Sequence, residues 1–364
     1  MAGKIDVLEV RRDDLATTRE VHEPLPHLGE GEVLLRVDRF GLTSNNVSYG
    51  VAADLVGYWR FFPAADDGWG RIPVWGFADV VESRSDSVEV GRRVFGYLPM
   101  ATHLIATPTR VSQSGFTDGV AHRADLPGTY NRYQFTRADP MYRPEKENHQ
   151  AVFVPLFFTS FFIDDYLADR EDFGADVLIL SSASSKTAAG VALCTSRREG
   201  PRPTIIGLTS AGNAEFVGRL GFYDEVCTYD EVDSLDSARH AVFVDVAGDA
   251  EVVAAVHGHF DDRLAASLRV GFTHWEAGGD DLALPGPERE MFFAPTQISK
   301  RVEEWGRKGY RDRVGAAWAD LLEVADEWVH FTEVRGLDGL RDAFLEMLGG
   351  DLDPSEALMI EVGE

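Results

Sequence analysis

The stretch Val177-Leu-Ile-Leu-Ser-Ser-Ala-Ser-Ser-Lys-Thr187 indicates the fold class of this chain. Its first four residues form a continuous apolar run, which is typical of a strand that is buried on both faces of a parallel sheet. The serines that follow suit a helix N-terminus, and a helix is predicted from Lys186 to Ser196. A buried strand that leads directly into a helix is the start of a βαβ unit.

The alternation of strand and helix continues after this unit. Further strands are predicted at 204–208, 225–228, 241–245 and 264–272, and helices at 213–220 and 251–260. This order predicts a mostly parallel sheet with helices packed on it. The rest of the chain is expected to hold helices and one last strand, at 300–305, 315–325, 337–348 and 357–362.

The first third of the chain has the pattern of β-structure instead. Strands or apolar runs are expected at 33–37, 72–81, 93–98 and 103–107. Residues 113–148 are polar, aromatic and arginine-rich with little periodicity, which predicts a long functional loop. Within it, Tyr130, Asn131, Arg132 and Tyr133 are expected to cover the cleft where two domains meet.

The apolar stretch from Ala151 to Ile163 is expected to be a buried element, since it is too short to cross a membrane. We therefore predict two domains. The β-rich domain covers 1–150 and is completed by about 326–364, and the nucleotide-binding domain covers 151–325.

The composition excludes several classes of function. The formal net charge of −26 repels nucleic-acid backbones and anionic membranes, so neither is an expected partner. The two cysteines, Cys194 and Cys227, are too few for a disulfide framework. The N-terminal residues show no apolar export signal, and a cytoplasmic protein with a small-molecule substrate is expected.

The order of the segments resembles the medium-chain dehydrogenase/reductase superfamily, in particular its zinc-free quinone and enoyl reductases. The resemblance is carried by Gly31-Glu-Val-Leu-Leu-Arg-Val37, Gly41-Leu-Thr-Ser-Asn-Asn46, Pro73-Val-Trp-Gly-Phe-Ala-Asp-Val-Val81, Leu220-Gly-Phe-Tyr-Asp-Glu-Val226 and Ser355-Glu-Ala-Leu-Met-Ile-Glu361. The run from Phe292 to Gly306 is typical of a divergent branch known as DUF2855. The resemblance implies an α/β protein with a GroES-like β-rich catalytic domain, a Rossmann-type doubly wound parallel sheet and a homodimeric assembly.

The turn after the first strand of a dinucleotide fold normally carries glycines that let the backbone approach the pyrophosphate. Here the first glycine is Gly190, inside the predicted helix, and the turn holds small hydroxyl residues and one lysine. One interpretation is phosphate binding through hydroxyls, amides and the lysine cation, by Ser184, Ser185, Lys186 and Thr187. The alternative is that a hydroxyl only caps the helix and the lysine is solvated.

The end of the second predicted strand lacks the carboxylate that would bind an NAD ribose. This favours NADP as the cofactor, with Thr209, Ser210 and Asn213 able to hold a 2′-phosphate. Asp245, after the fourth strand, is expected at the same edge of the sheet. The alternatives are a turn that binds nothing and an aspartate that caps structure.

Zinc enzymes of the superfamily use cysteine and a Gly-His-Glu step as ligands. The matching positions here are Thr43 or Ser44 and the step Gly76-Phe-Ala78, and no metal is predicted. Zinc-free relatives hold the substrate carbonyl with hydroxyl or amide donors, and the candidates are Asn45, Asn46, Tyr49 and Tyr58. The same side chains are also suited to turn bonds and core packing.

Three further side chains are weaker candidates. His103 is a possible proton donor, and His274 and Trp275 follow a predicted sheet strand where they would border a nicotinamide pocket. The expected function is an NADPH-dependent, zinc-free reduction of an activated C=C or C=O bond. The alternatives are a non-redox lyase-type enzyme and a nucleotide sensor that use the same cleft.

Overall fold

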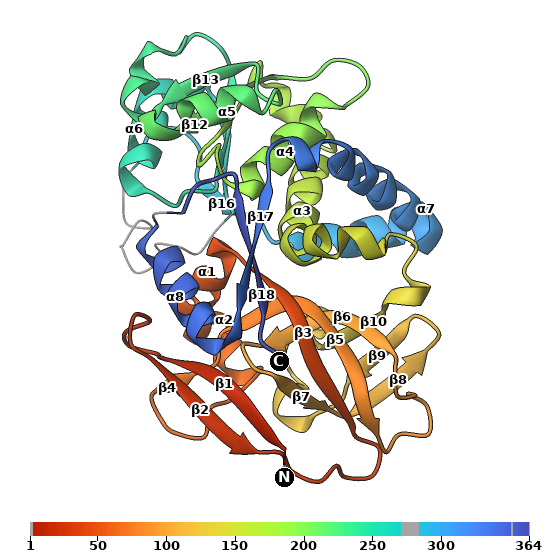
Figure 1. Ribbon diagram of the computed structural model, residues 1–364. Coiled ribbons are helices and arrows are strands. Elements are labelled where there is room, and N and C mark those ends of the chain that lie inside the picture. Colours follow the sequence, from red (N-terminus) through yellow and green to blue (C-terminus); the bar gives the residue numbers. More distant parts are fainter. Residues whose placement is uncertain (1–2, 271–283, 351, 364) are drawn as a thin grey trace. The chain divides into compact units, whose positions relative to one another are not determined.

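A computed structural model describes residues 3–270, 284–350 and 352–363. The chain divides into two units (Figure 1). The first unit comprises Met1–Val152 and Val329–Glu364, so both ends of the chain belong to it. The second unit is Phe153–Trp328.

The first unit is built from β-sheet. Among the described residues, its larger sheet has the order β17-β18-β3-β5-β6-β10-β9-β8, with β7 paired to β3. The central strands are β3 (Val33–Leu42), β5 (Pro73–Ser83) and β6 (Arg93–Pro99). The others are β7 (His103–Ala106), β8 (Pro108–Ser112), β9 (Gly115–Asp118), β10 (Arg132–Phe135), β17 (His330–Arg335) and β18 (Glu356–Glu361).

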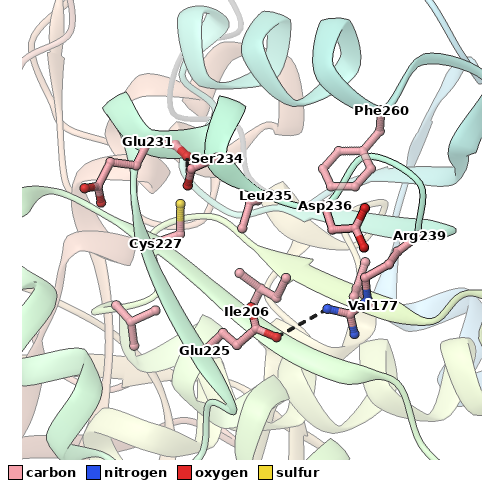
Figure 2. Close-up of a pocket in the computed structure, with 11 residues that line it drawn as sticks. Val177, Ile206, Glu225, Cys227, Glu231, Ser234, Leu235, Asp236, Arg239 and Phe260 are labelled. Carbon is pink, nitrogen blue, oxygen red and sulfur yellow. Dashed lines mark hydrogen bonds and ion pairs between the residues drawn. The ribbon is translucent and has the colours of Figure 1, made fainter.

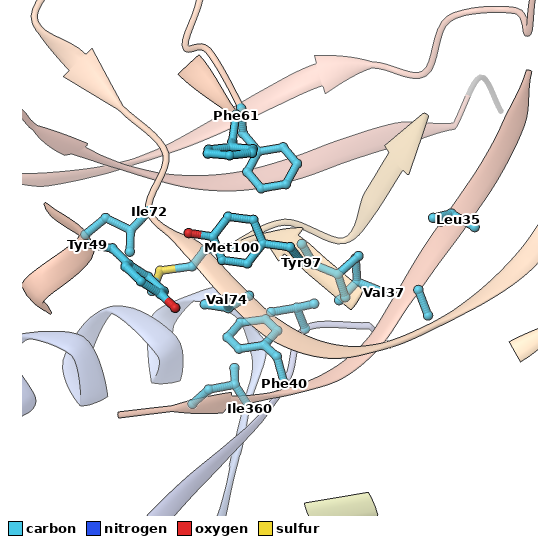
Figure 3. Packing of buried hydrophobic residues seen from close by; sticks show 14 of the residues in the cluster. Leu35, Val37, Phe40, Tyr49, Phe61, Ile72, Val74, Tyr97, Met100 and Ile360 are labelled. Atoms are coloured by element: carbon cyan, nitrogen blue, oxygen red, sulfur yellow. The ribbon is translucent and has the colours of Figure 1, made fainter. Parts of the chain in front are cut away.

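Smaller elements complete this unit. A second sheet has the order β2-β1-β4. Its strands and the helices of the unit are β1 (Lys4–Arg11), β2 (Thr18–Pro24), β4 (Trp69–Gly70), α1 (Ser44–Val51), α2 (Ala53–Val56) and α8 (Gly336–Gly349). Side chains such as Phe40, Val74 and Tyr97 fill the core under the sheets (Figure 3).

The segment predicted as a long loop is partly strand. β9 and β10 pair with each other, and β10 also pairs with β6, so the segment extends the main sheet. Alternate residues of β10, Tyr133 and Phe135, are buried, and Tyr133 stacks on Phe116 at 5.2 Å. The strands were missed because four residues are too few to show a clear period in the sequence.

The second unit contains an all-parallel sheet in the described residues, of order β13-β12-β11-β14-β15-β16. The order runs outward from β11 in both directions, as in a doubly wound fold. The strands are β11 (Val177–Leu180), β12 (Thr204–Thr209), β13 (Glu225–Thr228), β14 (Ala241–Asp245), β15 (Leu264–Arg269) and β16 (Arg289–Met291). The predicted parallel α/β sheet is confirmed.

Three helices lie between strands of this sheet: α4 (Lys186–Ser196), α5 (Ala214–Arg219) and α6 (Ala250–Phe260). A fourth helix, α7 (Ala294–Val324), follows the last strand, β16. The sequence predicted two helices within the range of α7. The structure has one long helix that is interrupted at Gly306, whose φ of 67° is not helical.

The apolar stretch after residue 150 belongs to the long helix α3 (Glu147–Ala168). Together with the preceding turn it is long and apolar enough to cross a membrane, although the sequence predicts a stretch too short to do so. Half of its most apolar window is buried inside the protein, as for Phe157, Phe162 and Ile163. Such burial is characteristic of a core helix, and the expected buried element is confirmed.

Candidate functional site

Hydrogen bonds join the turn after β11 to the end of β14. The Ser181 hydroxyl donates to Asp245 Oδ1 at 2.9 Å and accepts from the amides of Val246 and Ala247 at 2.9 and 3.0 Å. The Gly248 amide also donates to Asp245 Oδ1, at 2.9 Å. The carboxyl ends of two neighbouring strands are therefore held in a fixed relation, at the sheet edge where ligands bind in doubly wound folds.

The Asp245 carboxylate supports the turn after β11 and faces protein groups on both of its oxygens. Its side chain is completely buried, and its second oxygen accepts from Arg289 at 2.5 Å. Both carboxylate oxygens are engaged inside the protein, which favours the structural role over the cofactor contact.

The helix α4 begins directly after this turn. Ser185 is its N-cap, since its hydroxyl accepts from the Ala188 amide at 3.2 Å. Ser182 stands in the left-handed region with φ of 50° and donates its amide to the Tyr229 hydroxyl at 3.1 Å. The first helical turn contains Lys186 and Thr187 and no acidic residue. The helix dipole and the amides at the start of a helix make such an end favourable for an anion.

The tip of the second strand meets this turn. Asn213 donates its side-chain amide to the Ser184 hydroxyl at 3.1 Å. The structure thus brings together two candidates that lie 29 positions apart in the sequence. Ser210 is exposed, whereas Thr209 is only 1% exposed, and its hydroxyl is therefore not available to a 2′-phosphate.

Glycines near the turn have packing functions. A Cβ on Gly190 would lie 2.6 Å from Ser160 Oγ of α3, and a Cβ on Gly207 would lie 2.9 Å from both Ala183 Cβ and Tyr223 Cδ1. Tyr223 also donates to the Ala183 carbonyl at 2.8 Å. Sequence reasoning missed the support that Tyr223 and Tyr229 give to the turn, because no local pattern marks it.

Four tyrosines gather in the core of the β-rich unit. We call Tyr49, Tyr58, Tyr97 and Tyr130 the tyrosine cluster. Ring centroids are 4.6 Å apart for Tyr49 and Tyr58, 4.7 Å for Tyr97 and Tyr130, and 5.6 Å for Tyr49 and Tyr97. Tyr49 and Tyr97 are labelled in Figure 3. Two of these residues were sequence candidates, and the other two come from β6 and from the segment predicted as a loop.

The hydroxyls of the cluster are only partly paired. Trp75 Nε1 donates to the Tyr49 hydroxyl at 3.1 Å, and the Tyr58 and Tyr130 hydroxyls are 3.4 Å apart. In the described part of the chain, the buried Tyr97 hydroxyl has no hydrogen-bond partner. Burial raises the pKa of all four phenols. They are therefore neutral at physiological pH and able to donate a hydrogen bond to an oxyanion.

The two asparagine candidates differ. Asn46 is 2% exposed, accepts from the Thr43 amide and donates to the Pro73 carbonyl, both at 2.8 Å. Both ends of its amide thus hold the start of α1, and these contacts favour the turn-bond alternative over a catalytic role. Asn45 is partly exposed and interacts with the Tyr49 phenol.

Of the three weaker candidates, His103 belongs to the described residues. His103 bonds to the Thr102 hydroxyl at 3.1 Å, and its pKa is lowered by burial and by Arg36. His274 and Trp275 lie outside the described residues. Tyr133 is fully buried and donates to the Tyr97 carbonyl at 2.7 Å, so it supports the core.

The positions that match zinc ligands carry no metal-binding group. Gly76 has no room for a side chain, because a Cβ would lie 2.2 Å from the Arg39 carbonyl oxygen. Across residues 3–270, 284–350 and 352–363, no group of three or more histidine, cysteine, aspartate or glutamate side chains could hold a metal ion.

The second unit has a hollow of about 400 Å³, shown in Figure 2, and no residue of the turn at 181–185 is among those that line it. Its walls include Val177 and Glu225, the first residues of β11 and β13. Glu231, Asp236 and Glu225 make it acidic, and its Arg239 is bonded to Glu225 at 3.3 Å. It is therefore unfavourable for phosphate, since like charges repel.

Solved structures share this fold over the whole chain. CurA from Vibrio vulnificus in complex with NADPH has a TM-score of 0.64 at 15% identity, covering 99% of each chain. The quinone oxidoreductase from Coxiella burnetii has a TM-score of 0.58 at 12% sequence identity, and the match covers 99% of this chain and 100% of that one. The mitochondrial 2-enoyl thioester reductase heterodimer from Candida tropicalis has a TM-score of 0.59 at 11% sequence identity, and the match covers 99% of this chain and 100% of that one.

The β-rich GroES-like unit and the Rossmann-type unit define the fold of the medium-chain dehydrogenases and reductases, and the predicted fold is confirmed. A family model matches residues 40–353. The chain belongs to that family, described as "Protein of unknown function (DUF2855)". No functionally curated protein matches the sequence.

Proposed function

We propose that this protein is an NADPH-dependent, zinc-independent reductase of an activated C=C or C=O bond. The observation that carries the proposal is the hydroxyl-rich start of α4 at the carboxyl edge of a doubly wound sheet, with Lys186 in its first turn. Ser184, joined to Asn213, adds donors at the same edge. The structural neighbour CurA, with the highest similarity quoted above, was crystallised with NADPH.

The donors present suit a phosphorylated nucleotide. The N-terminus of α4, Ser185, Lys186 and Thr187 would hold the pyrophosphate, and Ser210 with Asn213 would hold the 2′-phosphate. No carboxylate stands at the tip of β12 to repel that phosphate, since the residues after Thr209 are serine, alanine, glycine and asparagine. Ser184 and Ser185 stand where relatives have glycines, so the phosphates would lie farther from the backbone.

The tyrosine cluster would supply the hydrogen-bond donors that the substrate oxygen needs during reduction. When bound, NADPH supplies a hydride to the carbon of an activated double bond, and the second hydrogen arrives as a proton from water. Negative charge then develops on the substrate oxygen. Neutral Tyr49 and Tyr58, with Asn45 beside them, would stabilise that oxygen by hydrogen bonds, and this stabilisation lowers the barrier.

The assembly we propose is a homodimer through the edge of the parallel sheet. Among the described residues, β16 pairs with β15 alone. Met291 at its end and Phe293 after it are 43% and 54% exposed. A second copy that paired with β16 would cover an unpaired strand edge and two apolar side chains.

Titration of the purified protein with NADPH and with NADH, followed by nucleotide fluorescence, tests the cofactor. NADPH should bind more tightly, because only it carries the 2′-phosphate. Lys186→Ala should weaken NADPH binding by about tenfold, the size of one charge-assisted contact. Lys186→Arg should retain most of the affinity.

The matched control is Lys308→Ala, which removes an exposed lysine paired with Asp312 and should leave binding unchanged. Absence of heat and of thermal stabilisation with NADPH at about 1 mM would overturn the reductase proposal. One bound zinc per chain by elemental analysis would overturn its zinc independence.

A further inference from the structure

The β-rich unit contains a cavity of about 300 Å³ that the proposed reaction does not use. Most of its wall is apolar, with Val7 of β1, Pro24 of β2, Phe62 and Ile105 among the residues that line it. Arg123 lines the same cavity and is only 1% exposed. A buried guanidinium in an apolar wall requires an explanation, because a charge that is removed from water must be paired.

The protein pairs Arg123 only in part. One terminal nitrogen, Nη2, is bonded to the Asp118 carboxylate. The guanidinium lies 5.0 Å from the centre of the Phe62 ring. Nε and Nη1 are both buried and have no hydrogen-bond partner among the residues that the structure describes.

Asp118 cannot supply the missing bonds. Its Oδ1 already accepts from the amides of Thr107 at 2.9 Å and Val120 at 3.1 Å, and its Oδ2 accepts from Arg123. The carboxylate is thus fixed by backbone on one side. Two N–H groups of the arginine remain for another acceptor.

The other polar groups at the cavity are already engaged. Arg71 is bonded to Glu9 and Glu23, and His122 Nε2 is 3.2 Å from the Phe61 carbonyl. Near Arg123, the Tyr133 hydroxyl gives its proton to the Tyr97 carbonyl. Burial raises the pKa of Tyr133 to about 12, although the Arg123 charge and a side-chain interaction with Arg123 act in the opposite direction. Arg123 Nε and Nη1 are nevertheless buried without a hydrogen-bond partner of normal geometry among the described residues.

We propose that this cavity binds a small organic carboxylate through Arg123, with the apolar part of the ligand against Phe62 and Ile105. The carboxylate would supply the acceptors that Nε and Nη1 lack, and charge-assisted bonds of this kind are the stronger ones. A cavity of about 300 Å³ holds a ligand of on the order of ten heavy atoms, since one water takes up about 30 Å³. The proposal is independent of the reductase assignment.

Calorimetric titration with benzoate tests the site, with the uncharged benzyl alcohol as the matched probe. Benzoate should bind and benzyl alcohol should bind at least about tenfold more weakly, because it cannot pair with the guanidinium. Arg123→Met should remove benzoate binding. Because that substitution leaves Asp118 without its partner, the variant is first checked for native thermal unfolding.

Ile105→Trp is the second variant, since it fills the cavity without touching the ion pair. It should remove benzoate binding and leave NADPH binding unchanged, which separates this site from the cofactor site. Absence of benzoate binding to the unaltered protein at about 10 mM would overturn the proposal. Benzoate affinity that persists in Ile105→Trp, or equal affinities for benzoate and benzyl alcohol, would also overturn it.

Discussion

Gly190 shows at the residue scale how one missing side chain lets two helices approach. A Cβ there would lie 2.6 Å from Oγ and 2.8 Å from Cβ of Ser160, and the Ser160 hydroxyl is itself bonded to the Thr187 carbonyl at 2.8 Å. Alanine normally favours a helix over glycine, but the close approach reverses this preference here. We expect Gly190→Ala to lower the free energy of unfolding by about 1–3 kcal/mol, the usual cost of overpacking.

Gly218 in α5 is the matched control, since a Cβ there would meet nothing within 4 Å. Gly218→Ala should raise the free energy of unfolding by about 0.4–1 kcal/mol, because alanine reduces the conformational entropy of the unfolded chain. Urea unfolding of both variants measures the difference. Equal stabilisation by the two substitutions would contradict the close approach seen at Gly190.

His257 is a buried titratable residue whose charge state affects stability. Its Nδ1 lies 2.9 Å from the Pro285 carbonyl and its Nε2 lies 2.9 Å from the Ser267 hydroxyl. The carbonyl can only accept, so Nδ1 carries the hydrogen and Nε2 accepts from Ser267. Burial, assisted by Arg289, lowers the pKa of His257 below its ordinary value of 6.5.

The native state therefore binds fewer protons than the unfolded chain, and the free energy of unfolding should fall as the pH falls below about 6.5. His257→Gln keeps a donor for Pro285 and an acceptor for Ser267 but cannot be protonated. We expect a smaller loss of stability in this variant between about pH 7.5 and about pH 5.5. An unchanged loss in urea unfolding at the two pH values would show that His257 is not responsible.

At the scale of elements, the Ser181–Asp245 contact joins the ends of β11 and β14. Asp245 is a buried carboxylate with a cationic partner and two neutral donors. Asp245→Ala would leave Arg289 without this carboxylate, and breaking a buried ion pair costs about 3–5 kcal/mol. We expect a loss of stability of this size in urea unfolding, together with weaker NADPH binding because the turn before α4 loses its support.

The control for this prediction is Glu215→Ala, which breaks an exposed pair with Arg219 on α5. Exposed pairs contribute about 1 kcal/mol or less, and stability should change little. Similar effects from Asp245→Ala and Glu215→Ala would mean that the buried contact does not stabilise the edge of the sheet.

At the scale of the whole molecule, the proposed homodimer depends on the β16 edge. Met291→Glu would place a charge on that edge, where like charges from two copies would meet. Light scattering after size exclusion should give twice the chain mass for the unaltered protein and the chain mass for this variant. Val90→Glu, at a 60% exposed residue of the β-rich unit, should remain dimeric. A monomeric unaltered protein would refute the assembly.

The sequence alone determined the local elements of the parallel sheet. The predicted strands 177–180, 225–228 and 241–245 and the helix 186–196 agree with the structure at both ends. Continuous apolar runs and a serine N-cap are local signals, so the residues themselves specify these boundaries.

The tertiary structure alone decided which polar side chains face a ligand. Asn46, Thr209 and Asp245 have the chemistry of a site, yet their burial engages or covers their polar groups within the protein. The tyrosine cluster joins positions 49, 58, 97 and 130, and the partly paired Arg123 became visible only beside its cavity. Burial and pairing depend on residues far apart in the chain, and a single sequence carries no local signal of such contacts.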